Sequence, residues 1–299
     1  MAEPVTRAKI IAAFAAVYII WGSTYLGILF AIETLPPFLM AGTRFVVAGA
    51  LLFAWAWRRR EADPTAAQWR TAAIIGGLLL LGGNGAVSWA EQYVPSGIAA
   101  LLIAVTPLWM VLLDWLWHGA RRPDVRIVMG LVLGFTGIAL LVGPAEIMGA
   151  GSVHLVGALV VLAGSLSWSI GSIHSRRTAS PAGGMLGVGM QMLCGGGLLL
   201  LLGTVTGEWA RLDLAAVSLR SALAVVYLAL FGSIVGYTAY MWLLQVVSAA
   251  RVATYAYVNP VVAVLLGWGL AGEALTMRMG VAAAVIVAGV ALITSARTR

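Results

Sequence analysis

The few side chains in this sequence that could do chemistry lie inside apolar segments. Arg44 is the most unusual of them. It lies about 10 Å along a predicted helix from Pro37, at roughly 1.5 Å per residue, too deep to be an ordinary flanking residue. Its guanidinium has the geometry to hold a substrate carboxylate. It could equally pair with Glu33 or Glu91, or hydrogen-bond helix carbonyls, so either a recognition role or a structural role is open.

Amide and aromatic side chains accompany Arg44 at interior positions. An amide inside an apolar helix hydrogen-bonds either a neighbouring helix or a ligand. Aromatic rings at helix ends would form an interfacial belt. Rings deeper in the helices form either a packed core or a cavity that stacks an apolar ligand. With Arg44, the candidate residues of one substrate cavity are Trp21, Tyr25, Asn84, Trp168, Gln191, Tyr237, Tyr240, Tyr255, Tyr257 and Asn259.

The residue types present disfavour other kinds of site. The three histidines are far apart, with no Cys or carboxylate beside them at metal-ligand spacing, so we expect no metal and no other cofactor. An integral-membrane enzyme would need clustered His, Asp or Glu near one face, and the sequence has none, so no catalytic residue is expected. No Gly-Lys-Ser/Thr follows the glycine-rich runs, which argues against direct ATP coupling. The net charge of +7 does not indicate nucleic acid, because the arginines lie at the ends of apolar runs.

The composition requires a bilayer as solvent. The chain has 299 residues, of which 62% are hydrophobic and 10% charged, whereas soluble domains carry about 25% charged residues. A helix needs about 20 apolar residues to cross the hydrocarbon core. Ten such runs fall near 10–32, 37–57, 71–90, 95–117, 126–143, 153–175, 184–204, 218–243, 248–270 and 278–296.

The distribution of arginine predicts how these helices are oriented. When the N-terminus is placed inside the cell, most basic residues fall in cytoplasmic segments, including 58–60, 121–122 and 176–177. The outer segments hold few, as the positive-inside rule requires. We therefore predict a multi-pass protein of the cell inner membrane with both termini in the cytoplasm.

The second half of the sequence repeats the first. At an offset of 153 residues, Trp89 aligns with Trp242 and Pro107 with Pro260. Each half holds five predicted spans, an odd number, so the second half must enter the membrane upside down. Inverted repeats of this kind are the architecture of many secondary transporters, with the substrate site at the repeat interface.

We accordingly predict an all-α integral membrane protein of ten transmembrane helices, arranged as two inverted five-helix repeats. The first repeat comprises residues 1–143 and the second residues 144–299. Pro107 and Pro260 are expected in mid-span, where a broken backbone is tolerated if it is buried in protein or lines a cavity. They either take part in gating or are simple packing kinks.

Several stretches resemble the EamA-type permeases of the drug/metabolite transporter superfamily. They are "YIIWGSTYLGI" (18–28), "MAGTRFVVAGALL" (40–52), "VPSGIAALLIAVTPLW" (94–109), "ALFGSIVGYTAY" (229–240) and "TYAYVNPVVAVLLG" (254–267). Gly272 and Glu273 also match family positions, whereas residues 117–124 lack the acidic residue expected after the fourth helix. The resemblance covers essentially all ten predicted spans. It implies ten helices and export of small metabolites, often amino acids.

These observations predict a secondary carrier that exports small metabolites, with apolar or aromatic amino acids as the first candidates. Transport would proceed by alternating access through a central cavity between the repeats. Efflux of lipophilic cations or drugs is the alternative, weakened because no Glu or Asp lies clearly mid-membrane. The expected partners are a small-molecule substrate and the lipid bilayer, and the chain is expected to be a monomer or a homodimer.

Overall fold

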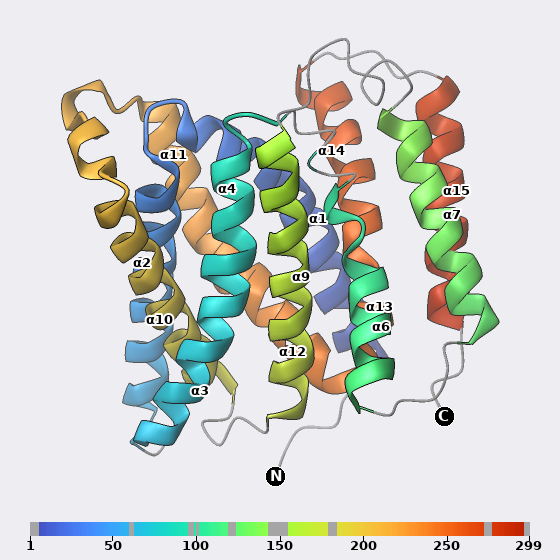
Figure 1. The fold of residues 1–299 in the computed structure, drawn as a ribbon, viewed down its shortest axis with the longest axis horizontal. Coiled ribbons are helices and arrows are strands. Elements are labelled where there is room, and N and C mark those ends of the chain that lie inside the picture. Colours follow the sequence, from blue (N-terminus) through green and yellow to red (C-terminus); the bar gives the residue numbers. More distant parts are fainter. Residues whose placement is uncertain are drawn as a thin grey trace.

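The computed structural model describes residues 6–59, 63–94, 99, 102–118, 124–142, 155–178, 184–271 and 277–295. The regular secondary structure of these residues is entirely helical (Figure 1). The predicted boundary between the repeats, at residues 143–144, lies outside them. Residues 119–123 and 272–276, where the two halves were expected to differ, also lie outside.

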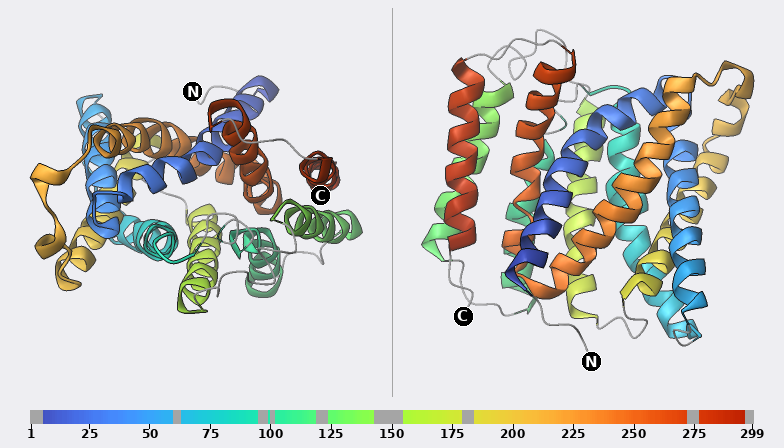
Figure 2. Two further views of the ribbon diagram at one scale, coloured as in Figure 1. Left: turned by 90° about the horizontal axis from the view of Figure 1, so that it is seen from above. Right: turned by 180° about the vertical axis from the view of Figure 1, so that it is seen from behind.

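The helices run side by side between the two ends of a bundle (Figures 1 and 2). In chain order they are α1 (Arg7–Ile32), α2 (Pro37–Arg58), α3 (Ala66–Gly76), η1 (Gly77–Gly85), α4 (Ala86–Ala90), α6 (Thr106–His118), α7 (Val125–Val142), α9 (Leu155–Arg177), α10 (Gly184–Val205), η2 (Glu208–Arg211), η3 (Leu214–Ala216), α11 (Leu219–Tyr227), η4 (Leu228–Tyr237), α12 (Thr238–Val246), α13 (Ala249–Val252), α14 (Tyr255–Ala271) and α15 (Met277–Ser295).

Within the described residues, six helices are long and apolar enough to cross a membrane. They are Arg7–Ile32, Pro37–Arg58, Ala66–Ala90, Leu155–Arg176, Gly184–Val205 and Leu219–Val246. The other predicted spans fall on shorter helices, namely α6, α7, α13 with α14, and α15. The start of α1 and the end of α15 lie at the same end of the bundle (Figure 1), which is the arrangement that an even number of crossings produces.

Two of the long helices contain a π-helical segment. The first, η1, lies between α3 and α4, and the second, η4, lies between α11 and α12. The offset of 153 residues places Gly77–Gly85 on residues 230–238, so the two segments occupy nearly equivalent positions in the two halves. Segments of π-helix are rare and occur frequently at functional sites.

Glycines allow α2 and α10 to pack against each other along an extensive contact. A Cβ atom on Gly49 would lie 2.8 Å from the backbone nitrogen of Leu193. A Cβ atom on Gly189 would lie 2.8 Å from the backbone nitrogen of Phe53. A larger residue at either position would push the helices apart, because small residues are what lets backbones approach in a membrane.

The two repeat-related prolines lie in different helical contexts. Pro107 lies in the first turn of α6, which begins one residue before it, after a turn at 104–105. In a first turn the missing N–H costs no hydrogen bond. Pro260 does lie inside its helix, α14, which follows a turn at 253–254. Only Pro260 therefore removes a hydrogen bond from a helix interior.

Candidate functional site

A cavity lies among α1, α2, η1, α4, α6, α9, η4 and α14. It holds about 750 Å³ of space, including the part open to the outside. Eight of the residues predicted from sequence line it: Trp21, Tyr25, Arg44, Asn84, Trp168, Tyr237, Tyr255 and Asn259. These eight residues supply one cation, two amides and five aromatic rings.

Arg44 is buried in α2 with 3% of its surface exposed. Its Nη2 donates a hydrogen bond of 2.5 Å to Oδ1 of Asn84 in η1. Its guanidinium carbon lies 4.5 Å from the centre of the Phe45 ring. The Nε–H has no hydrogen-bond partner. The guanidinium is thus oriented by one amide and keeps a donor for a further acceptor.

Of the two acidic residues considered for Arg44, only Glu91 lies near it. Glu33 is instead paired with Arg220, with 3.4 Å between Oε1 and Nη1. Glu91 follows the last residue of α4, and both its carboxylate oxygens are buried without a hydrogen-bond partner. Burial raises the pKa of the Glu91 carboxyl to about 8, and the positive charge of Arg44 opposes the increase.

Aromatic rings from both halves of the chain form one wall of the cavity. The ring of Trp21 lies 5.5 Å from that of Trp168, 4.9 Å from that of Tyr240 and 5.1 Å from that of Tyr255, between centroids. The indole Nε1 of Trp168 donates to the hydroxyl of Tyr240 at 2.8 Å. Tyr240 does not line the cavity itself but packs behind the two tryptophans and orients one of them.

Two other predicted residues lie away from the cavity surface. Gln191 in α10 is 4% exposed and accepts a hydrogen bond of 2.9 Å from the hydroxyl of Tyr237. It therefore positions a lining residue. Tyr257 packs against Phe135 of α7, with 6.2 Å between ring centroids, and belongs to a separate apolar cluster. A helix turns by about 100° per residue. Tyr255, two residues earlier, therefore faces the cavity, whereas Tyr257 faces α7.

Asn259 connects α14 to α1 beside the cavity. With its amide nitrogen turned toward them, it donates to the backbone oxygens of Tyr18 at 3.3 Å and Tyr255 at 3.0 Å. It also forms a side-chain hydrogen bond with Tyr25. The Asn259 amide thus adds hydrogen bonds to α14, the helix from which Pro260 removes one.

Small hydroxyl groups on the cavity wall were not predicted. Thr24, Thr106 and Ser165 each donate a hydrogen bond to the backbone carbonyl of the residue three positions earlier. Ser233 in η4 is buried and its Oγ has no hydrogen-bond partner. The sequence offers no signal for this, because a Ser in an apolar helix usually bonds its own backbone.

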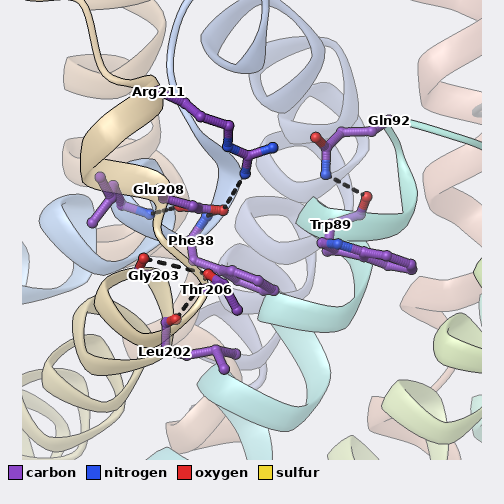
Figure 3. A network of polar contacts seen from close by, with 9 residues as sticks. Phe38, Trp89, Gln92, Leu202, Gly203, Thr206, Glu208 and Arg211 are labelled. Carbon is purple, nitrogen blue, oxygen red and sulfur yellow. Dashed lines mark hydrogen bonds and ion pairs between the residues drawn. The ribbon is translucent and has the colours of Figure 1, made fainter.

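A buried carboxylate holds the start of α2, the helix that carries Arg44 (Figure 3). Glu208 accepts hydrogen bonds from the backbone nitrogens of Phe38 at 3.3 Å and Leu39 at 2.9 Å. It also lies 3.5 Å from Nη2 of Arg211. A carboxylate here satisfies free N–H groups and interacts favourably with the helix dipole, which helps to set the position of α2.

The comparison with protein families places this arrangement in context. The model of the EamA-like transporter family matches residues 8–143 and 155–295. The chain belongs to the EamA-like transporter family. The two matched segments cover most of the chain, and neither extends across residues 144–154.

Individual relatives of this EamA-like transporter agree with the assignment. The uncharacterized inner membrane transporter YedA of Escherichia coli K12 is 44% identical over 283 residues, which cover 94% of this chain and 89% of YedA. The uncharacterized transporter YvbV of Bacillus subtilis is 25% identical over 290 residues, 97% of this chain and 92% of YvbV. A solved crystal structure superposes with a TM-score of 0.78 at 23% identity, covering 97% of each chain, and supports the fold alone.

The family and these relatives establish the class of the protein. It is a multi-pass transporter of the inner membrane and not an enzyme. Its partners are accordingly a small-molecule substrate and the lipid bilayer.

Proposed function

We propose that this transporter exports small metabolites that carry a carboxylate and an apolar side chain, with apolar and aromatic amino acids as the principal class. The observation that carries the proposal is the position of Arg44 on the wall of an otherwise largely aromatic cavity. A buried guanidinium without an acidic hydrogen-bond partner favours an acidic ligand, because an uncompensated buried charge is costly. If a carboxylate of the protein were hydrogen-bonded to Arg44, its positive charge would already be compensated and it would not favour an acidic ligand.

Each part of such a substrate has a complementary group on the wall. The carboxylate fits the guanidinium of Arg44, in a charge-assisted hydrogen bond. The side chain fits against the rings of Trp21 and Trp168, which offer large apolar surfaces. The unpartnered hydroxyl of Ser233 is available to a polar group of the ligand.

Alternating access between two inverted five-helix repeats is the proposed mode of transport. The helix contacts support it, because they recur when the two halves are exchanged: α1 packs on α14 and α9 on α6, while α1 packs on η4 and α9 on η1. A bundle with such internal symmetry has two related ways of opening, one toward each side of the membrane. The cavity lies where these contacts meet.

Efflux of lipophilic cations is a second candidate, because the ring faces of Trp21, Trp168 and Tyr255 could hold a cation. The electrostatics of the wall argue against it. Arg44 lies on the same cavity, and two like charges repel strongly in a medium of low dielectric constant.

Counterflow in proteoliposomes tests the proposal directly. Vesicles loaded with unlabelled phenylalanine should accumulate labelled phenylalanine, tryptophan and methionine transiently, and protein-free vesicles should not. Accumulation of a lipophilic cation without any of the amino acids would replace the proposed substrate class by the alternative.

A further inference from the structure

The buried carboxylate of Glu91 has no role in the function proposed above. Both its oxygens are buried and lack hydrogen-bond partners. A group of this kind is costly to bury, and its cost is reduced only by a nearby opposite charge or by a bound proton. The Glu91 carboxyl, close to Arg44 and without a hydrogen bond, therefore needs a functional explanation.

Two ionisable groups interact electrostatically with Glu91, one from α2 and one from α1. Arg44 of α2 favours the ionised form of Glu91, and Tyr25 of α1 lies close enough to interact with it. The end of α4 is held by a hydrogen bond of 2.9 Å from Nε2 of Gln92 to the carbonyl of Trp89 (Figure 3). The Glu91 carboxylate thus lies close enough to Arg44 to interact with its charge but is not hydrogen-bonded to it.

We infer that Glu91 sets the charge class of the substrate. When it is ionised, Glu91 and Arg44 form a neutral pair that accepts a zwitterion; when it is protonated, Arg44 remains a lone cation that accepts a monoanion. This inference rests on the proposed function, because it requires a substrate carboxylate on Arg44. It concerns a specificity residue, since Glu91 acts through the charge of Arg44.

The physical basis is the net charge that a site of low dielectric constant tolerates. A monoanion that binds while Glu91 is ionised places two carboxylates around one guanidinium. A zwitterion adds no net charge to the neutral pair. Like charges brought together in this way are strongly disfavoured, so loss of the Glu91 charge should favour the monoanion by roughly tenfold or more.

The sign of the pH dependence follows from the raised pKa of Glu91, about 8. The protonated form dominates below that value and the ionised form above it. Binding of monoanions should therefore strengthen as the pH falls through about 8. Binding of zwitterions should strengthen as the pH rises.

The test compares phenylalanine with 3-phenylpropionate, which lacks only the ammonium group. Counterflow of each is measured with the full-length protein from about pH 6 to about pH 8, where both carboxylates stay ionised. In the parental protein the ratio of 3-phenylpropionate to phenylalanine transport should rise as the pH falls. In Glu91→Gln the ratio should be independent of pH and should equal the parental value at the acid end, where Glu91 is protonated. Glu33→Gln, a carboxylate exposed outside the cavity, is the matched control and should behave as the parent.

A second measurement does not depend on the substrate. Infrared difference spectra of the purified protein should contain a protonated-carboxyl band that titrates near neutral pH and is missing in Glu91→Gln. Its midpoint should move to higher pH in Arg44→Gln, which removes the cation. If the parental protein transports neither compound, the proposed substrate class is wrong, and the infrared titration alone decides about Glu91. A selectivity in Glu91→Gln that still follows pH, or a band that neither variant alters, overturns the inference.

Discussion

At the scale of single residues, Arg44 is oriented by its hydrogen bond to Asn84, and we propose that it binds the substrate carboxylate. Arg44→Gln retains a side chain of similar shape, the one that its repeat partner Gln191 carries, and should keep the fold. Loss of a charge-assisted hydrogen bond costs about 1.5–3 kcal/mol, or roughly 10- to 150-fold in affinity. We expect that loss for phenylalanine and a much smaller one for phenylalanine amide, measured as half-saturation in counterflow. Arg220→Gln removes an exposed cation outside the cavity and should change neither. Equal weakening of the acid and the amide would instead assign Arg44 a structural role.

At the scale of helices, Pro260 and Pro107 provide a matched pair of substitutions. Pro260 interrupts the hydrogen bonding of α14 beside the cavity, whereas Pro107 lies in the first turn of α6. A proline in a helix interior costs about 3 kcal/mol relative to alanine, so Pro260→Ala should stabilise a straight α14. We expect this variant to exchange substrate more slowly while its melting temperature is unchanged or higher. Pro107→Ala should transport at nearly the parental rate and lose at most about 1 kcal/mol of stability through the unfolded state. Equal rates in both variants would make the interior proline a packing feature.

At the scale of the whole molecule, the direction of each half in the membrane decides whether the repeats are inverted. Single cysteines replace exposed residues in a Cys194→Ala background, and an impermeant thiol reagent is applied to intact cells. Glu33→Cys and Asp213→Cys, one from each half, should react, and Arg59→Cys should react only after the cells are opened. Equivalent positions of the two halves are separated by five crossings and therefore lie on opposite sides of the membrane. The arginine-rich ends of the helices stay in the cytoplasm. Labelling of Arg59→Cys in intact cells would contradict the predicted orientation, and labelling of both Arg59→Cys and Asp213→Cys would contradict the inverted repeat.

The sequence by itself determined the class of the protein, because the bilayer acts on composition and on the length of apolar runs, which are properties of the chain. It also indicated eight of the residues that line the cavity, since costly polar and aromatic residues deep in a span have few reasons to be there. Periodicity could not distinguish Tyr255, which lines the cavity, from Tyr257, which packs on Phe135. That distinction depends on the neighbouring helix.

Tertiary structure alone decided which partners these residues have. Arg44 contacts Asn84 and lies near Glu91, whereas Glu33 pairs with Arg220. The sequence indicated Glu33 and Glu91 as possible partners of Arg44 but did not distinguish them, and it did not indicate Asn84 as a partner. The π-helical segments η1 and η4 were also not predicted from the sequence. A shift from i→i+4 to i→i+5 hydrogen bonding depends on the surrounding packing rather than on residue type. Glu208 reaches the start of α2 from 170 residues away. Contacts between distant segments depend on how the helices pack in three dimensions, and no local pattern encodes that packing.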